Sequence, residues 1–240
     1  MVHFKLTESD KTWLVTYFPN LRFAENKGTE TIVGPLEFDA YYDKTQDIFI
    51  HFPNDDYTGK YRIQDNYDVQ IELVSSDFSI LPQVKEIGGR IKQLGKQKKI
   101  PLYELHINDD GTACLSGKYD QQEFYNKGFI LKDFFYKMII PFFYDQSFYE
   151  KYNEWPRDWW SHGVQGEIRN LIQRVPFLQK YIKDPQSYQR LMKLLEAKKV
   201  RKEWPCICGS NKRFVDCHMD FFVFTRSVNF RKLKQFYKKR

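Results

Sequence analysis

The chain has 240 residues, of which 42% are hydrophobic and 18% aromatic, and its formal net charge at pH 7 is +7. This length suits either one large domain or one domain with a small appendix, and the apolar content is sufficient for a packed core. No uninterrupted apolar run reaches the roughly 18 residues that a membrane-spanning helix needs, which argues against an integral helical membrane protein. Charged residues between Met1 and Trp13 do not fit a secretory signal peptide, so we expect a cytoplasmic protein.

The positive charge is concentrated in the last part of the chain. The segment from Arg190 to Arg240 holds 15 Lys or Arg residues against 4 Asp or Glu, and the remaining 189 residues carry a net charge of −4. A basic segment beside a mildly acidic body is typical of a protein that docks to an acidic partner, either nucleic acid or protein. A solvated basic face is the alternative.

Residues 8–74 carry the pattern of a helix followed by an antiparallel meander. Apolar residues between Glu8 and Phe18 have helical spacing, and Pro19 ends that helix. β-Branched and aromatic runs then alternate with turn residues, among them Gly34-Pro35, and short connections favour antiparallel pairing. The four expected strands are Thr31–Val33, Leu36–Tyr42, Asp47–Phe52 and Tyr67–Val74.

Residues 76–100 are expected to be irregular, with an extended piece at Leu81–Val84, a turn at Gly88-Gly89 and a basic loop at Lys92–Lys99. Pro101–Ile107 is predicted to be a short strand. Asn108-Asp109-Asp110-Gly111 follows as a turn, because Asx side chains bond to their own backbone and glycine takes positive φ. Cys114 comes just after this turn, either as an accessible thiol or as a half-buried small hydrophobic residue.

The rest of the chain favours helices, which makes the expected fold class α+β. Apolar residues at three- and four-residue spacing predict a helix at Phe129–Phe143, which Pro141 either kinks or ends. An aromatic loop, Trp155–Gly163, precedes two further helical patterns, at Val164–Val175 and from Asp184-Pro185 to about Lys202. The expected domains are residues 1–155, a helical extension at 156–203, and a small zinc knuckle with a basic tail at 204–240.

The most specific local motif of the chain consists of Cys206, Cys208, Cys217 and His218. A Cys-x-Cys pair followed by Cys-His supplies four soft ligands, the number that a closed tetrahedral zinc site requires. We therefore expect a structural Zn²⁺ ion, because four protein ligands leave no open position for a reaction. Pro205–Ser210 also resembles the opening of the SEC-C motif, and this resemblance implies a module that docks a partner.

Three segments within residues 1–155 resemble a ubiquitin-conjugating enzyme (UBC-like fold) of the divergent bacterial kind. His106-Ile107-Asn108 corresponds to the family's His-Pro-Asn segment, Gly111–Leu115 to its Gly-x-x-Cys-Leu site, and Leu81–Val84 to its Pro-x-Val strand. Ile107 replaces the usual proline, and the spacing from His106 to Cys114 is two residues shorter than usual. The resemblance implies a UBC-like antiparallel four-stranded meander with flanking helices.

The same resemblance implies a transferase. Cys114 would be the nucleophile that carries a ubiquitin-like protein as a thioester. Asn108, or a backbone amide of the turn, would hold the oxyanion. His106 would support the turn or act as a base, and His162 would line the site or pack within its own loop.

The partner that the resemblance implies is a ubiquitin-like protein or the C-terminus of a cyclic-oligonucleotide nucleotidyltransferase (a CD-NTase-like protein), in bacterial antiphage defence. The sequence contains no adenylation domain, so a separate activating enzyme or the partner itself would supply activation. The alternative, from a different class, is a non-catalytic UBC-like scaffold whose zinc knuckle and basic tail recruit a protein or a nucleic acid.

Overall fold

The computed structural model describes residues 2–26, 28–76, 79–117, 121, 124–157, 189, 201–206 and 208–219. The chain divides into two compact units, Met1–Trp159 and Trp160–Arg240. His162 and the helices expected at Val164–Val175 and after Asp184 lie outside the described residues, apart from isolated positions. In the described part, no helix combines the length and the apolar character needed to cross a bilayer.

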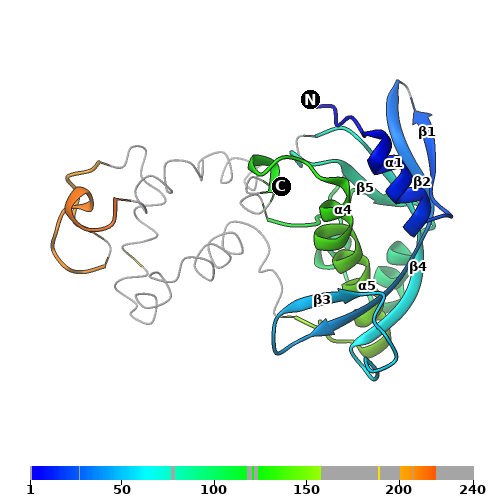
Figure 1. Cartoon of the computed structure of the whole chain (residues 1–240). Coiled ribbons are helices and arrows are strands. Elements are labelled where there is room, and N and C mark those ends of the chain that lie inside the picture. Colours follow the sequence, from blue (N-terminus) through cyan, green and yellow to red (C-terminus); the bar gives the residue numbers. More distant parts are fainter. Residues whose placement is uncertain are drawn as a thin grey trace. The chain divides into compact units, whose positions relative to one another are not determined.

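The first unit is built on one antiparallel sheet with a few helices, which confirms the α+β class (Figure 1). Its strands are β1 (Arg22–Asn26), β2 (Thr29–Asp43), β3 (Ile48–His51), β4 (Arg62–Glu72) and β5 (Gln83–Glu86). β4 pairs along one edge of β2, β1 and β3 pair at opposite ends of its other edge, and β5 pairs with β4. The sheet has five strands rather than the expected four. The expected strands Thr31–Val33 and Leu36–Tyr42 form one strand, β2, and the polar stretch β1 and the extended piece β5 are added.

β2 runs unbroken through Gly34-Pro35, where the sequence predicted a break. The φ of Gly34 is 139°, and a Cβ there would lie 2.4 Å from the backbone oxygen of Asn20, so only glycine fits this close approach. The N–H of Tyr42 donates to the carbonyl oxygen of Tyr61 on the β4 side, at 3.0 Å. Bonding to β4 alternates along the strand, so the even-numbered residues of β2 bond to β4 and the odd-numbered residues point their N–H and C=O groups away from it. Pro35 is odd-numbered, so its missing N–H removes no bond between β2 and β4.

Helix α1 (Glu8–Tyr17) confirms the first predicted helix, and Thr7 with Asp10 forms a capping box at its start. After β5 the structure departs from the sequence-based expectation. The stretch expected to be a strand at Pro101–Ile107 is instead a 3₁₀ helix, η1 (Leu102–Leu105), followed by a single bridging residue, Ile107.

Helix α2 (Arg90–Lys98) occupies the stretch that was expected to be a basic loop, so that prediction is wrong. The cap of this helix comes from the preceding strand: the carboxylate of Glu86 accepts hydrogen bonds from the N–H groups of Arg90 and Ile91, each at 3.2 Å. Gly89, with φ of 82°, turns the chain into the helix. Ile91 and Leu94 are buried, so the charged sequence forms an amphipathic helix.

A long apolar helix crosses the first unit from Leu131 to Tyr152. It consists of α4 (Leu131–Phe134), a π-helical turn η2 (Phe135–Ile139) and α5 (Ile140–Tyr152). The predicted helix at Phe129–Phe143 is confirmed and extends further than expected. The π turn comes just before Pro141, which lacks an N–H and whose ring would contact the preceding turn of a regular α-helix. The helix thus continues through Pro141 instead of ending there.

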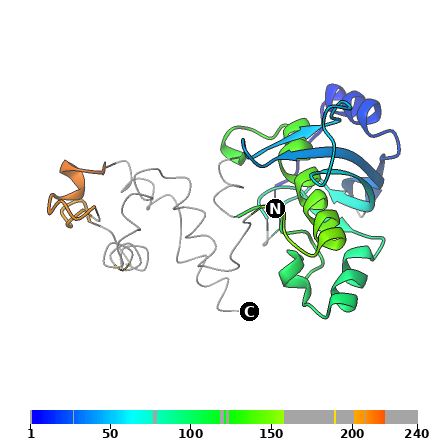
Figure 2. The ribbon, with the colours of Figure 1, turned by 90° about the horizontal axis from the view of Figure 1, so that it is seen from below.

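The middle of this helix is buried on all sides, because every residue from Ile140 to Phe148 is buried. On the sheet side, the Tyr144 hydroxyl donates to the carbonyl oxygen of Tyr61, at 2.8 Å. On the other side, the Gln146 amide donates to the carbonyl oxygen of Leu105 in η1, at 3.0 Å. Figure 2 shows the helix between the strands and the short helices near residues 90–105. The core of the first unit is therefore organised around α5.

Candidate metal centre and candidate cysteine site

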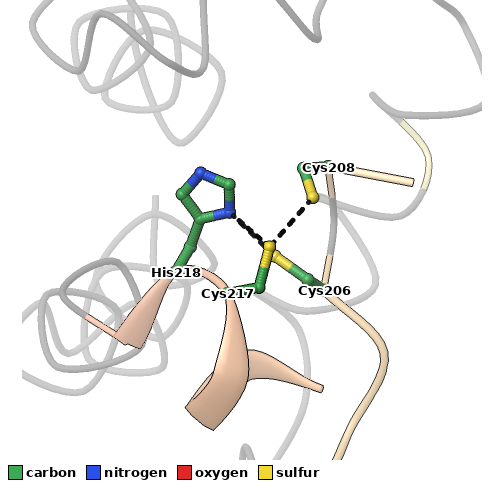
Figure 3. A group of neighbouring side chains, drawn as sticks. All are labelled: Cys206, Cys208, Cys217 and His218. Atoms are coloured by element: carbon green, nitrogen blue, oxygen red, sulfur yellow. Dashed lines mark hydrogen bonds between the residues drawn. The ribbon is translucent and has the colours of Figure 1, made fainter. Parts of the chain in front are cut away.

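The four residues of the cysteine-histidine motif lie together in the second unit, with their donor atoms directed toward one another (Figure 3). All four donor atoms lie within 4.8 Å of one another. Cys208 Sγ is 3.5 Å from Cys217 Sγ, and His218 Nδ1 is 3.2 Å from the Sγ atoms of both Cys206 and Cys217. Bonds of about 2.3 Å to sulfur and 2.0 Å to nitrogen place tetrahedral ligands about 3.5–3.8 Å apart. The cluster can therefore bind a metal ion after only a small outward movement of the ligands.

A tight bridge brings the first two ligands into position. Pro205 and Arg213 form an antiparallel bridge, and the N–H of Cys206 donates to the carbonyl oxygen of Lys212, at 2.7 Å. Gly209 has φ of 76°, which lets the backbone reverse directly after the Cys-x-Cys pair.

The last two ligands are positioned by a 3₁₀ turn, η3 (Phe214–Asp216). The N–H groups of Cys217 and His218 both donate to the carbonyl oxygen of Phe214, at 3.2 and 3.1 Å. In residues 201–206 and 208–219, Phe214 is the one large apolar side chain that is buried. A single buried ring is a small core for these residues, and a bound metal ion would stabilise their fold.

Ser210 contacts two of the thiols, a role that the sequence analysis did not assign. Its Oγ lies 3.1 Å from Cys208 Sγ and 3.3 Å from Cys217 Sγ. Burial raises the pKa of the Cys208 thiol, but hydrogen bonds with Ser210, Cys217 and Cys206 together outweigh it and lower that pKa to about 6. Hydrogen bonds to ligating thiolates orient them and tune the site. The Gly-Ser pair after the second cysteine was visible in the sequence, but its contacts depend on the reversal at Gly209.

Cys114 lies in the first unit, at the end of a small bridged loop. Ile107 and Ala113 form an isolated antiparallel bridge, and the N–H of Cys114 donates to the carbonyl oxygen of His106, at 2.7 Å. The N–H of Ala113 donates to the carbonyl oxygen of Val84 in β5, at 2.7 Å, which attaches the loop to the sheet. Cys114 is partly exposed and forms no disulfide.

The predicted turn before Cys114 is confirmed, and side chains hold it closed. Asn108 Nδ2 donates to Thr112 Oγ1 at 3.0 Å, and the Thr112 hydroxyl and N–H both donate to Asp110 Oδ1, at 2.6 and 2.9 Å. Gly111 has φ of 80°, as the turn requires. The structure thus places the Asn108 amide on Thr112. The sequence analysis missed Thr112, although an Asp side chain often accepts from the backbone N–H two residues on, as Asp110 does here.

His106 is brought next to Cys114 through the backbone. It follows η1 with φ of 56°, and its residue is 7% exposed. Its ring meets the ring of Trp155 edge-on, with centroids 5.7 Å apart. The carbonyl oxygen of His106 is the group that receives the Cys114 N–H. The backbone of His106 thus connects the end of η1 to Cys114.

The first unit also contains a buried ion pair that the sequence did not reveal. Asp145 Oδ2 lies 2.6 Å from the Arg157 guanidinium, and their side chains are 5% and 11% exposed. Burial raises the pKa of Asp145 to about 6, against the opposing charge of Arg157. The guanidinium also lies over the Phe49 ring, 4.5 Å from its centroid. This pair attaches the chain beyond α5 to β3. No residue spacing in the sequence predicts it.

Comparisons of the chain with protein-family models, with curated proteins and with solved structures found no match.

Proposed function

We propose that this chain is a ubiquitin-conjugating-like transferase in which Cys114 carries the C-terminus of a partner protein as a thioester. The observation that carries the proposal is the setting of Cys114, a partly exposed thiol that directly follows a closed turn attached to the sheet. The succession of a helix, antiparallel strands, a cysteine loop and a long helix also supports a UBC-like arrangement.

The reaction has two steps that balance without a change of oxidation state. The Cys114 thiolate attacks the carbonyl carbon of an activated C-terminus, such as an acyl adenylate. A C–S bond forms, AMP leaves, and the thiol proton passes to the solvent. An amine of the target then attacks the thioester, so a C–N bond forms, the C–S bond breaks, and the thiol is regenerated. A separate activating enzyme would supply the acyl adenylate.

Asn108 and His106 act in this proposal as positioning residues. The bond from Asn108 to Thr112 closes the turn, and the carbonyl of His106 fixes the N–H of Cys114. Each acyl-transfer step develops negative charge on the carbonyl oxygen, which N–H donors must stabilise. A rigid loop would present its backbone N–H groups to that oxygen without further rearrangement.

The partners in the proposal are a ubiquitin-like protein or the C-terminus of a CD-NTase-like protein, within bacterial antiphage defence. The proposal takes this partner class from the family that the cysteine loop resembles. The carbonyl chemistry is the same for both partners, so the geometry of the loop favours neither.

For the metal cluster we propose Zn²⁺ in a structural role. Three thiolates and one imidazole are a common donor set of structural zinc sites, and four protein ligands complete the tetrahedron. Cys206, Cys208, Cys217 and His218 would hold the ion, which would fix the fold of the knuckle.

A thiol-sensitive adduct tests the transferase proposal. The purified chain is incubated with ATP, the activating enzyme and each candidate partner encoded near its gene, and the mixture is separated with and without reductant. We expect an adduct that reductant removes and that Cys114→Ala abolishes. Cys208→Ser is the matched control: it should lose zinc and keep the adduct. If no neighbouring protein gives a reductant-sensitive adduct, or if Cys114→Ala still gives one, the proposal is wrong.

A scaffold function is the second candidate, and the charge around the knuckle favours it. Arg201, Lys202, Lys212 and Arg213 are all exposed beside the metal cluster. A cationic surface of this kind suits an acidic partner. In this case Cys208→Ser should abolish partner capture, whereas Cys114→Ala should preserve both capture and biological activity.

A further inference from the structure

We propose that the first unit has a docking groove for an extended, basic segment of a partner protein, at the edge of β2 between β1 and β3. β1 pairs with β2 as far as Val33, and β3 pairs with it from Ala40 onward. Figure 1 shows these two strands at opposite ends of the sheet. Between them β2 is paired in the sheet on its β4 side alone, at Gly34–Phe38. The groove is independent of Cys114 and goes beyond the proposed function.

The backbone of Glu37 faces this gap. The carbonyl oxygen of Asp39 accepts from the N–H of Phe52 on the β3 side, at 2.8 Å, and backbone groups two residues apart in a strand point the same way. In the part of the chain that the structure describes, neither the N–H nor the C=O of Glu37 forms a hydrogen bond. One residue of an extended segment placed opposite Glu37 would form both bonds. The backbones of Asn20 and Phe52 occupy the edge on either side, so the rest of the segment leaves the edge instead of extending along it. Pro35 lacks an N–H, which keeps the open edge short.

A hollow with a volume of about 440 Å³ lies over the same stretch. Tyr17, in the last turn of α1, and Phe52, just after β3, belong to its wall, with ring centroids 6.4 Å apart. Both side chains are exposed, at 48% and 47%. Phe52 has φ of 52°, a left-handed conformation that costs free energy in a bulky residue. The chain thus holds an aromatic ring at the rim of the hollow in spite of backbone strain.

The charge of the hollow is negative. Its lining residues include Glu37, Asp39 and Asp65 and no Lys or Arg, but Asp39 is paired with Arg62 and Asp65 with Arg90, so Glu37 supplies the negative charge that an occupant would meet. Burial raises the pKa values of Asp39 and Asp65, but hydrogen bonds from arginines outside the lining outweigh it and lower both, so these groups are ionised at neutral pH. The Glu37 carboxylate accepts from the neutral amide of Asn20, at 2.8 Å, and in the described part of the chain it has no cationic partner.

These features define the occupant. Directly opposed residues of antiparallel strands put their side chains on the same face, about 5 Å apart at Cβ. A lysine or arginine opposite Glu37 would therefore meet its carboxylate and lie near two exposed aromatic rings, which attract cations. A nucleic acid would bring phosphates toward the Glu37 carboxylate and has no strand backbone to pair. The matching ligand is an extended peptide with a basic side chain at its centre.

A titration followed by NMR tests this groove. The ¹⁵N-labelled full chain is titrated with a synthetic heptapeptide, acetyl-Thr-Val-Thr-Lys-Thr-Val-Thr-amide. We expect shifts of the Glu37 and Asp39 amides, at least fivefold weaker binding to Glu37→Gln, and unchanged binding to Glu25→Gln, a matched change on exposed β1. Replacing the peptide's lysine by glutamate, or methylating its backbone nitrogen, should weaken binding at least tenfold. Phe52→Gly, which keeps the backbone conformation and removes the ring, should also weaken it.

Absence of shifts at millimolar peptide would overturn the proposal. So would equal binding by the wild type and Glu37→Gln, or equal binding of the lysine and glutamate peptides. Loss of the Cys114 adduct has no bearing on this titration, so the two proposals fail or stand separately.

Discussion

Replacing His51 by phenylalanine should remove much of the acid sensitivity of the first unit. His51 ends β3, and its ring is stacked on Tyr136, with centroids 4.5 Å apart and planes 22° apart. Its Nδ1 is buried and has no hydrogen-bond partner among the described residues. Burial lowers the pKa of His51 from 6.5 to about 4, against a weaker opposing contact with the Tyr136 backbone.

The size of the effect follows from proton linkage. Because the folded pKa is below the unfolded one, the unfolded chain binds more protons between about pH 4 and 6.5, and stability falls as the pH falls through that window. With pKa values of about 4 and 6.5, the free energy of unfolding decreases by about 2 kcal/mol between pH 7.5 and pH 5.0. Phenylalanine cannot titrate and preserves an aromatic stack on Tyr136, so this decrease should disappear in His51→Phe.

Urea unfolding followed by far-UV circular dichroism at both pH values measures the effect. The wild type should lose about 2 kcal/mol more than His51→Phe between pH 7.5 and 5.0. Acid release of a metal from His218 affects both proteins equally and cancels in the difference. His3→Phe is the matched control, because His3 is exposed and should leave the slope unchanged. If the wild type and His51→Phe lose the same free energy, burial of His51 is not the source of acid sensitivity.

Three further predictions concern the core and the knuckle. Gly34→Ala should lower the free energy of unfolding by about 1–3 kcal/mol more than Gly59→Ala. Both glycines have positive φ, but only at Gly34 would the new Cβ lie within 3 Å of a backbone atom. Equal urea midpoints of the two variants would contradict this. Phe148→Ala should cost about 3–5 kcal/mol by the same assay, because the ring is fully buried and stacked on Tyr61; a cost below 1 kcal/mol would mean that α5 is not central to the core. Stripping the metal with a mercurial reagent should release one zinc per chain and accelerate amide exchange at Cys217, while β4 amides stay protected; equal acceleration in both units would contradict the independent knuckle.

Elements with a local signal were predictable from the sequence. Helix α1 was found because its apolar spacing and its stop signal, Pro19, lie within a few residues of each other. The clean alternation after Tyr67 identified β4, although the strand begins earlier, at Arg62, because its first residues put polar side chains on the open face of the sheet. The metal cluster was predictable for the same reason, since its ligands lie close together in the sequence.

The errors occur where a group outside the stretch itself decides its local structure. Gly34-Pro35 is a turn signal, yet here the glycine accommodates the backbone at Asn20, far back in the sequence. The run of lysines after Arg90 reads as a loop, but a carboxylate in the preceding strand, that of Glu86, caps a helix there. Around Cys114 the residue types predicted the turn correctly. They did not predict that the Asn108 amide would donate to Thr112, because that bond depends on how the turn closes.

The burial of α5 has a consequence for how this sequence can diverge. Most helices keep one face in water, where substitutions are nearly neutral and accumulate freely. Between Ile140 and Phe148 there is no such face, so each of these positions changes the packing of the core when it mutates. We expect this stretch to vary least among descendants of a common ancestor. A search pattern anchored on it would separate true relatives from chains that share only the cysteine-histidine spacing.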